Sequence, residues 1–453
     1  MKKIIKIGLV AALLGPFGLL KGQAQQAPQA LSLQQSIDYA LQNQPNVKNA
    51  RIDTEIAKAK VGEIRSAGLP QINAGAEIGD NFIQQKNFLP AEFFGGEPGT
   101  FQPVTFTPQY SGNASLTGSQ LLFDGSYLIG LKAASTYTQL SKKTETQTEI
   151  DVAEQVSKAY YGVLVNRERM TLLDQNLSRL DTLLKQTEAM FNEGFAEKLD
   201  VDRLKVSYNN LMVEKQKTER LLELSQDLLK FQMGMPQSET LVLTDKLADV
   251  EVDMAKTNIS DFNYSNRIEY SILETQRDLA LLDIKNKKAG YLPRLSLNGR
   301  YGALAANNDF SNITKLNGDN WLSFGYVGLG IQVPVFDGLR KHYQVQQAKL
   351  TLDKTKVGFT ALENSIDLQL QKASTDLTNA LAVLDNQQRN LELAEDIARV
   401  TKIKFQEGVG TNLEVVTAET SLKEAQVNYY AALYDAMIAK VDLDKATGTL
   451  LKK

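Results

Sequence analysis

One motif occurs twice in this chain, as Phe-Asn-Glu-Gly-Phe-Ala-Glu-Lys-Leu-Asp-Val at residues 191–201 and as Phe-Gln-Glu-Gly-Val-Gly-Thr-Asn-Leu-Glu-Val at residues 405–415. The two copies are 214 residues apart. A second matching pair lies upstream at almost the same spacing, with Leu-Phe-Asp-Gly at 122–125 and Val-Phe-Asp-Gly at 335–338. Matches at nearly one offset indicate an internal duplication, so the 453 residues form two similar halves rather than several unrelated domains.

Each half predicts the same order of elements: helix, strand, loop, strand, long helix, tip and helix. We place the halves at residues 36–235 and 258–449, joined by a connector at 236–257 and preceded by a linker at 25–35. The elements expected in the first half are helix 36–66, strands 71–79 and 111–122, helix 125–191 and helix 197–231. Those expected in the second half are helix 264–289, strands 294–301 and 323–335, helix 338–407 and helix 412–446.

The long helix 125–191 carries a seam whose positions alternate spacings of three and four, which is typical of a coiled coil. The seam begins at Val156 and recurs in the same register from Leu370. Sixty-seven residues without proline correspond to about 100 Å of helix. The shorter helices of the first half together match this length, and those of the second half do so less closely. We therefore expect the short helices to stack end to end along the long one in an elongated antiparallel rod. The core of an ordinary helical bundle is the alternative interpretation of the stripe.

The segments between the helices have a period of two, which predicts half-buried strands. Residues 327–335 alternate apolar side chains with Gly, Gln and Pro, and residues 72–78 do so more weakly. The loops at 80–110 and 302–322 are expected at the surface. A soluble sheet packed on helices is one interpretation, and a transmembrane barrel is the other. The helical stripes are already used by the seams, which favours the barrel. Because lipid does not tolerate open strand edges, several chains would have to close it together.

Composition excludes many kinds of chemistry. Residues 1–24 have a lysine-rich start, an apolar middle and small residues before Gln25, which predicts a secretory signal peptide. Its removal would change the formal net charge from -3 to about -7, which disfavours nucleic-acid binding. With no cysteine and one histidine, His342, the usual thiol, zinc and Ser-His-Asp sites are excluded unless they are built around His342. We expect no metal and no cofactor, although a site made only of carboxylates remains an alternative.

The residues at the two strand-to-helix junctions have direct structural explanations. Asp124 and Asp337 can cap the helices that follow, because a carboxylate accepts hydrogen bonds from the free N–H groups of a first turn. Gly125 and Gly338 allow the sharp bend. Pro334 has no N–H to offer a sheet, so it suits the end of a strand. We expect these residues to be structural rather than catalytic.

The duplication, the junctions at 121–125 and 334–338 and the two tip motifs resemble one family in their order and spacing. Residues 31–450 are similar to the TolC-like outer membrane efflux proteins of Gram-negative bacteria. The resemblance implies a mostly α fold with a small β part, in which long antiparallel coiled-coil helices form a periplasmic tunnel. Four strands per chain would contribute to a trimeric, twelve-stranded transmembrane β-barrel. The implied partners are a homotrimer, outer membrane lipid, a periplasmic adaptor (membrane fusion) protein and an inner-membrane transporter of RND or ABC type.

The resemblance also assigns roles to the tips. The family's acidic tip position matches Asp200 and Glu414, so a trimer would present six carboxylates at the periplasmic aperture. Helix capping is the alternative role for both. Thr417 and Gly410 stand where a second acid and a basic locking residue occur in the family, so we expect a gate lock that is weaker or built differently. The tip residues expected to contact the adaptor are Phe191, Gly194, Leu199, Phe405, Gly408 and Leu413. The junction residues are Phe123, Asp124, Gly125, Pro334, Phe336, Asp337 and Gly338.

We therefore predict an outer membrane channel-tunnel that serves as the exit duct of a tripartite efflux or secretion system. Small molecules or polypeptides would pass through it passively, driven by an inner-membrane pump. The alternative from another class is a periplasmic or surface coiled-coil structural protein without a pore. An enzyme ranks third, because no convergent set of carboxylates can be identified.

Overall fold

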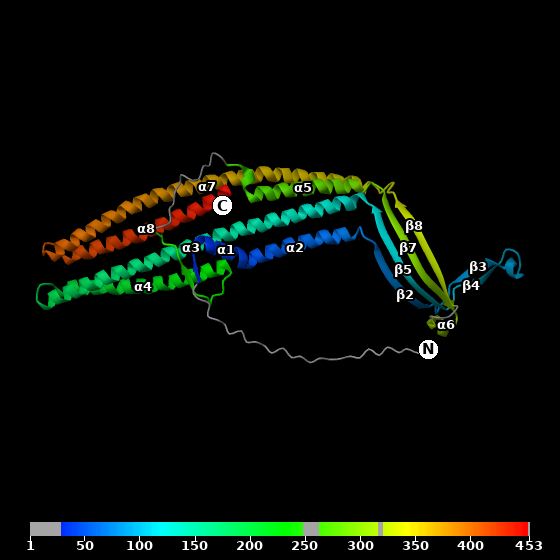
Figure 1. The fold of residues 1–453 in the computed structure, drawn as a ribbon, viewed down its shortest axis with the longest axis horizontal. Helices are drawn as coiled ribbons and strands as arrows, with labels where there is room; N and C mark the ends of the chain where they lie inside the picture. The colour runs from blue at the N-terminus through cyan, green and yellow to red at the C-terminus, as the bar shows by residue number, and fades with distance from the viewer. Residues whose placement is uncertain (1–28, 248–261, 316–319, 452–453) are drawn as a thin grey trace, which may run out of the picture.

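The computed structural model describes residues 29–247, 262–315 and 320–451. The predicted signal peptide and part of the predicted connector 236–257 lie outside these residues. The described chain is a long rod of helices with a small sheet at one end (Figure 1). This confirms a mostly α fold with a small β part.

The bounds of the elements follow the predicted order closely. The helices are α1 (Leu33–Asn43), α2 (Pro45–Ser66), α3 (Gly125–Asn192), α4 (Lys198–Met233), α5 (Ile268–Ala289), α6 (Phe310–Thr314), α7 (Arg340–Gln406) and α8 (Asn412–Thr447), with 3-10 turns η1 (Ala91–Phe94) and η4 (Tyr264–Asn266). The strands are β1 (Gln29–Leu31), β2 (Gln71–Asp80), β3 (Lys86–Pro90), β4 (Phe101–Thr105), β5 (Tyr110–Phe123), β6 (Leu241–Leu243), β7 (Arg294–Asn307) and β8 (Trp321–Gln332).

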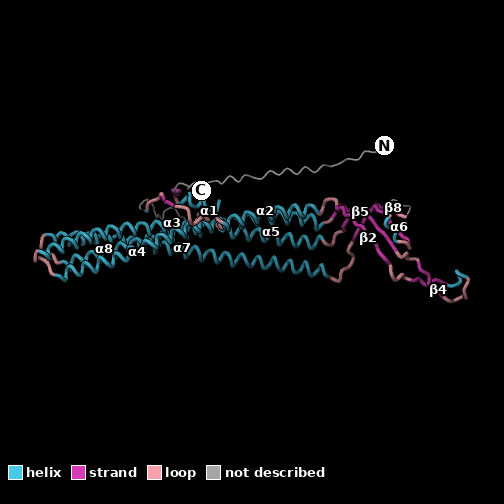
Figure 2. The backbone as a smooth tube through the Cα atoms, turned by 90° about the horizontal axis from the view of Figure 1, so that it is seen from below, coloured by secondary structure: helices cyan, strands magenta, loops and turns pink. Residues whose placement is uncertain are grey.

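The helices pack as two long members, each lined by two shorter ones. α3 has 68 residues, about 100 Å, and contacts α2 on its sheet-side half and α4 on its far half (Figures 1 and 2). α5 and α8 line α7 in the same way, and α3 also contacts α5 and α8. Val156, Val163 and Leu370 of the predicted seams are buried. The end-to-end stacking inferred from helix lengths is therefore confirmed.

A core in the middle of the rod joins these helices. Tyr160 and Leu164 of α3 pack there with Leu229 and Met233 of α4, and all four side chains are 0–1% exposed. The Tyr160 hydroxyl donates to the carbonyl of Leu31 at 3.2 Å. Burial is the main reason that the pKa of this phenol is raised.

Two predicted linkers contain a small sheet. β1 pairs in parallel with β6, so the expected linker 25–35 is wrong where it includes β1 and the start of α1. Arg167 of α3 donates to the carbonyl of Leu243 at 3.0 Å, which fixes this sheet on the rod. The pairing joins segments about 210 residues apart, and three-residue strands have no visible period.

The expected single helix 36–66 is wrong as one element, because it is broken at Gln44. Gln44 has extended backbone angles, φ -64° and ψ 128°, and its side chain caps α2 by accepting from the N–H of Val47 at 3.1 Å. Pro45 is the first residue of α2. Proline cannot donate to the preceding turn but is favoured as the first residue of a helix, which explains the break.

The sheet has the order β2-β5-β7-β8, and all pairs are antiparallel. Its register places Ile72 opposite Gly118, Gly118 opposite Gly299, and Gly299 opposite Val327. Alternate residues of all four strands therefore share one face, which is apolar across the sheet. The opposite face is polar on β2, β5 and much of β7. There, the guanidinium of Arg300 donates to the Ser115 hydroxyl at 3.2 Å.

Several element bounds in the second half differ from the prediction. β7 runs six residues beyond 301, because small residues continue the ladder to Asn307 between β5 and β8. β8 stops at Gln332 instead of 335, and α7 starts at Arg340 instead of 338. Gly338 and Leu339 both have φ of 66°, a left-handed conformation that ends the connector and delays the helix.

The two expected surface loops contain structure of their own. β3 and β4 form a hairpin that projects beyond the sheet (Figure 2). In the second loop, Ile313 of α6 is fully buried, and its carbonyl accepts from the indole N–H of Trp321 at 3.2 Å. Within the described residues, no helix has the length and hydropathy needed to cross a membrane.

Candidate functional site: helix tips and strand-helix junctions

The two tips lie together at the end of the rod opposite the sheet (Figure 1). In the first, α3 ends at Asn192, and Gly194 has φ of 83°. In the second, α7 ends at Gln406, and Gly408 has φ of 76°. As expected from the sequence, a glycine in the left-handed region closes each long helix, because other residues rarely adopt this conformation.

A buried amide connects the tips to each other. Asn412, the first residue of α8, is 6% exposed, and its side-chain N–H donates to the backbone carbonyl of Asp200 at 3.2 Å. Below it, Leu204 of α4 and Val415 of α8 are buried in one cluster with Leu180 of α3. The starts of α4 and α8 are therefore held side by side, although no sequence motif pointed to Asn412.

Asp200 and Glu414 occupy the third position of equivalent helices but differ in their partners. Glu414 belongs to a capping box: its N–H donates to the Thr411 hydroxyl at 3.3 Å, and its carboxylate accepts from the N–H of Thr411 at 3.4 Å. The Asp200 carboxylate lies 3.6 Å from the guanidinium of Arg203 and caps nothing. The helix-cap role that was an alternative for both acids is therefore observed only for Glu414.

The surface of the tips is apolar at several predicted positions. Phe191, Leu199 and Leu413 are 40%, 51% and 53% exposed. Phe405 differs, because it is partly buried against the cluster of Leu180 and Leu204. Phe195 and Val409, which follow the two tip glycines, are 80% and 78% exposed and were not predicted as contact residues. They could have been found as apolar residues at equivalent positions of a turn.

At the first strand-helix junction, the predicted cap of α3 is observed. The Asp124 carboxylate caps α3 by accepting from the N–H groups of Ser126 and Tyr127 at 2.8 and 3.1 Å. It also lies 3.7 Å from Arg294 at the start of β7, which ties the two halves together. Gly125 is the first residue of α3, and its φ is not positive. A Cβ there would lie 2.8 Å from the far end of the Leu292 side chain, so glycine makes room for this contact between the halves.

The second junction departs from that plan. The Asp337 carboxylate accepts from the N–H and the ammonium of Lys341 at 3.2 and 2.9 Å. Lys341 is four residues beyond the aspartate, whereas Ser126 and Tyr127 are two and three residues beyond Asp124. Hydrogen bonds from Lys341 lower the pKa of Asp337. Pro334 and Phe336 lie in the connector rather than in β8, and Phe336 is 82% exposed, compared with 38% for Phe123.

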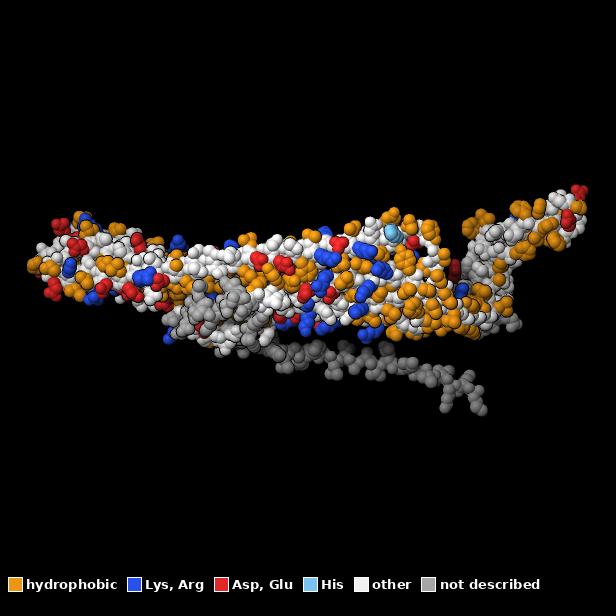
Figure 3. Space-filling model, turned by 90° about the horizontal axis from the view of Figure 1, so that it is seen from above, with side chains coloured by type: hydrophobic (Ala, Val, Ile, Leu, Met, Phe, Trp, Pro, Cys, Tyr) orange, Lys and Arg blue, Asp and Glu red, His pale blue; other side chains and the backbone are white. Residues whose placement is uncertain are grey.

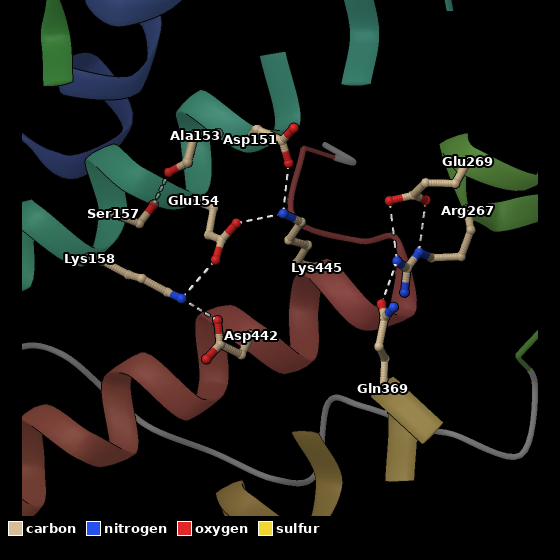
Figure 4. Close-up of polar contacts among 10 residues, drawn as sticks. All are labelled: Asp151, Ala153, Glu154, Ser157, Lys158, Arg267, Glu269, Gln369, Asp442 and Lys445. Carbon is tan, nitrogen blue, oxygen red and sulfur yellow. Dashed lines mark hydrogen bonds and ion pairs between the residues drawn. The ribbon is translucent and has the colours of Figure 1, made fainter. Parts of the chain in front are cut away.

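Sequence reasoning missed a chain of ion pairs midway along the rod (Figure 4). Lys445 of α8 lies between Asp151 and Glu154 of α3, at 2.7 and 2.6 Å. Lys158 lies between Glu154 and Asp442, at 2.7 and 2.5 Å. Burial alone would raise the pKa of Glu154, but the hydrogen bonds and charges of the two lysines outweigh burial and lower it.

A second group of polar contacts lies beside these ion pairs in Figure 4. Arg267 is 4% exposed, forms an ion pair with Glu269 at 3.1 Å, and donates to the Gln369 side chain and the Ala446 carbonyl at 2.9 Å each. It joins the start of α5 to α7 and α8. The part of the chain that the structure describes contains no group of three His, Cys, Asp or Glu arranged to hold a metal.

Comparison with known proteins identifies the family to which this architecture belongs. Residues 36–227 and 271–449 match the family described as "Outer membrane efflux protein". The chain belongs to this family. The predicted localisation in the outer membrane and the predicted function in efflux are thereby confirmed. The family is one of channels and efflux ducts.

Several relatives share the full length of the chain. It is 22% identical to the outer membrane protein TolC of Vibrio cholerae, over 99% of this chain and 96% of that protein. It is also 22% identical to the outer membrane efflux protein BepC of Brucella suis, over 99% of this chain and 91% of that protein. Among solved structures, the Neisseria gonorrhoeae MtrE outer membrane channel in its open state has a TM-score of 0.72 at 19% identity, covering 93% of this chain and 89% of that one. VceC of Vibrio cholerae has a TM-score of 0.68 at 15% identity, covering 92% and 96%.

Proposed function

We propose that three copies of this chain close into one exit duct, a barrel through the outer membrane that continues as a helical tunnel in the periplasm. The sheet carries the proposal. Among the described strands, β2 and β8 each have one edge without a partner, and alternate residues form a continuous apolar face. Unpaired backbone groups cost several kcal/mol each in lipid. Pairing β8 of one copy with β2 of the next, around three copies, would remove both open edges of the four-stranded sheet and give twelve strands.

Exposed stripes on the helices support the same closure. Tyr343, Leu350 and Val357 of α7 are spaced by seven residues and are 56%, 61% and 70% exposed. Ile52 and Ile56 of α2 are 56% and 60% exposed. A spacing of seven is the pattern of a seam that needs a second helix. We infer that α7 of one copy packs against α2 of the next, so that the helices of three copies surround one tunnel.

The tips give the duct its partners and its aperture. Their exposed apolar residues, Phe195 and Val409 among them, suit a protein contact, and we assign them to a periplasmic adaptor. An inner-membrane transporter of RND or ABC type would supply the energy, so the duct itself is passive. Asp200 and Glu414 of three copies would place six carboxylates at the periplasmic end, a ring that attracts cations.

Conductance in planar bilayers tests both parts of this proposal. The detergent-purified wild type should form discrete cation-selective channels. The double variant Asp200→Ala with Glu414→Ala should lose the cation preference, whereas Asp202→Ala, a control in the same helix turn, should keep it. A wild type that never conducts would refute the duct. Unchanged selectivity in the double variant would refute only the aperture.

A further inference from the structure

The helix ends that meet the sheet carry a concentration of positive charge. Residues 57–66, 124–134, 280–294 and 333–349 comprise the sheet-side ends of α2, α3, α5 and α7 with their adjoining connectors. These residues, here called the basic collar, contain eleven Lys and Arg but only four Asp and Glu. Their formal net charge is +7, in a chain whose total is -3. The charge is therefore strongly segregated along the molecule.

Much of this charge is not neutralised by the chain itself. Five collar residues have a carboxylate within ion-pairing distance, such as Lys60 with Glu63 at 2.6 Å. Within the described parts of the chain, six others are exposed and form no ion pair: Arg65, Lys132, Lys285, Lys288, Arg340 and Lys349.

Helix stability explains only part of the collar. Arg65 and Lys288 lie in the last turns of α2 and α5, where the negative end of a helix favours cations. Arg340 is the first residue of α7, where the positive end disfavours it, whereas the neighbouring Lys341 is paired with Asp337. Neither α3 nor α7 has an acid in its first turn, although acids would stabilise a helix there. Cations at both kinds of helix end point to an external anionic partner.

The position of the collar identifies that partner. Figure 3 shows basic side chains over the helix ends, directly beside the apolar surface of the sheet on the same face of the molecule. On that surface, Val327, Leu329 and Ile331 are 77%, 68% and 67% exposed. The collar extends about 13 Å along the helices from the sheet. Long Lys and Arg side chains within this distance can reach the headgroup layer that borders a hydrocarbon core.

We propose that the basic collar binds the anionic phospholipid headgroups of the membrane leaflet on the helix side of the sheet, and thereby fixes the depth of the protein in the bilayer. This inference rests on the proposed duct, because it requires the apolar face of the sheet to meet lipid. Each Lys or Arg near an anionic membrane surface is worth about 1 kcal/mol, roughly a fivefold preference, and the effect is screened by salt.

Lipid selection by the full-length protein tests the proposal. Wild type is reconstituted with equal phosphatidylglycerol and phosphatidylcholine, and native mass spectrometry reports the ratio of the lipids that remain bound. The collar variant replaces Lys132, Lys288, Arg340 and Lys349 with Gln. The control variant replaces Lys48, Lys142, Lys217 and Arg220 with Gln, which removes the same charge elsewhere on the helices. All three proteins are also assayed for conductance.

We expect wild type and control to retain phosphatidylglycerol at least about tenfold over phosphatidylcholine, and the collar variant to approach a ratio of one. In wild type alone, raising the salt from 0.1 to 1 M should lower the preference several-fold. Equal preference in collar and control variants, or a wild type without preference, would overturn the collar. Because conductance is read separately, a conducting wild type without lipid preference refutes this inference and leaves the duct standing.

Discussion

Asp200 and Glu414 occupy equivalent helix positions, but only Glu414 also caps its helix. At Glu414, the effect of the charge can therefore be tested separately from the effect of the cap. Gln at the third position can still complete a capping box, whereas Ala cannot. We therefore predict that Glu414→Gln lowers cation selectivity without loosening the tip. Glu414→Ala should do both, with a local loss of about 1 kcal/mol, or roughly fivefold faster amide exchange at the start of α8. Hydrogen exchange checks this, with Asp200→Asn as the variant expected to leave exchange unchanged. Equal protection in both Glu414 variants would contradict it.

Leu339 is the one residue other than glycine with a positive φ in the described chain. A left-handed conformation costs an L-residue roughly 1–2 kcal/mol, and glycine avoids this cost while losing about 0.5–1 kcal/mol of chain entropy. Leu339→Gly should therefore stabilise the second junction by about 0.5 kcal/mol. Val335 is an exposed residue of the same connector and has no positive φ. Val335→Gly therefore costs chain entropy without removing a strained conformation and should lower stability. The ranking of the two variants against wild type by thermal unfolding in detergent is the test.

The ion pairs between α3 and α8 make the middle of the rod sensitive to acid. Because the pKa of Glu154 is lowered in the folded chain, its stabilising contribution is present above the unfolded pKa and is lost as the pH falls through the folded value. The window therefore lies below about pH 4.5. Lys445 has a raised pKa, so its contribution is lost only in alkali, above 10.5.

Glu154→Gln should accordingly lower stability at pH 7 by on the order of 1 kcal/mol, after allowance for partial solvent screening. It should also flatten the loss of thermal stability between pH 5 and 3. Glu55→Gln is the matched control, since Glu55 pairs with Lys58 at the surface and is 69% exposed. Melting curves across this pH range decide the matter. A variant that follows the wild-type profile would show that Glu154 does not set the acid response.

The long elements could be predicted from their periodicity. Contacts between segments far apart in the sequence could not be predicted. The seam through Val156 and the alternation around Leu329 arise from local spacing, so helix lengths and strand faces could be inferred. The break at Gln44 had a local signal, Pro45, which a single-helix interpretation overrode. The β1–β6 pairing and the ion pairs of Lys445 had none, because their partners lie more than 200 residues away. At the tips, the presence of glycine predicted the left-handed backbone that ends each long helix. The sequence did not predict which of the two acids caps a helix.

In the molecule as a whole, the seams within the rod are buried, but apolar residues on its outer helices remain exposed. Within the described chain, clusters such as that of Tyr160 and Leu164 bury the seams between α3, α4 and α8. On the sheet side, α2 and α7 instead leave Ile56, Leu350 and Val357 exposed. A hydrophobic stripe of this length is costly in water, so its burial should come from assembly.

Changes in this stripe should therefore affect assembly rather than folding. We predict that Leu350→Asp with Val357→Asp converts the detergent-purified protein from trimer to monomer by light scattering. Circular dichroism should stay helical, because both side chains are largely exposed in the single chain. Thr351→Asp places one aspartate about 100° around the helix from position 350 and should remain trimeric. Loss of helix in the double variant would mean that the stripe supports the single chain. A double variant that stays trimeric would place the contacts between copies on another face of α7.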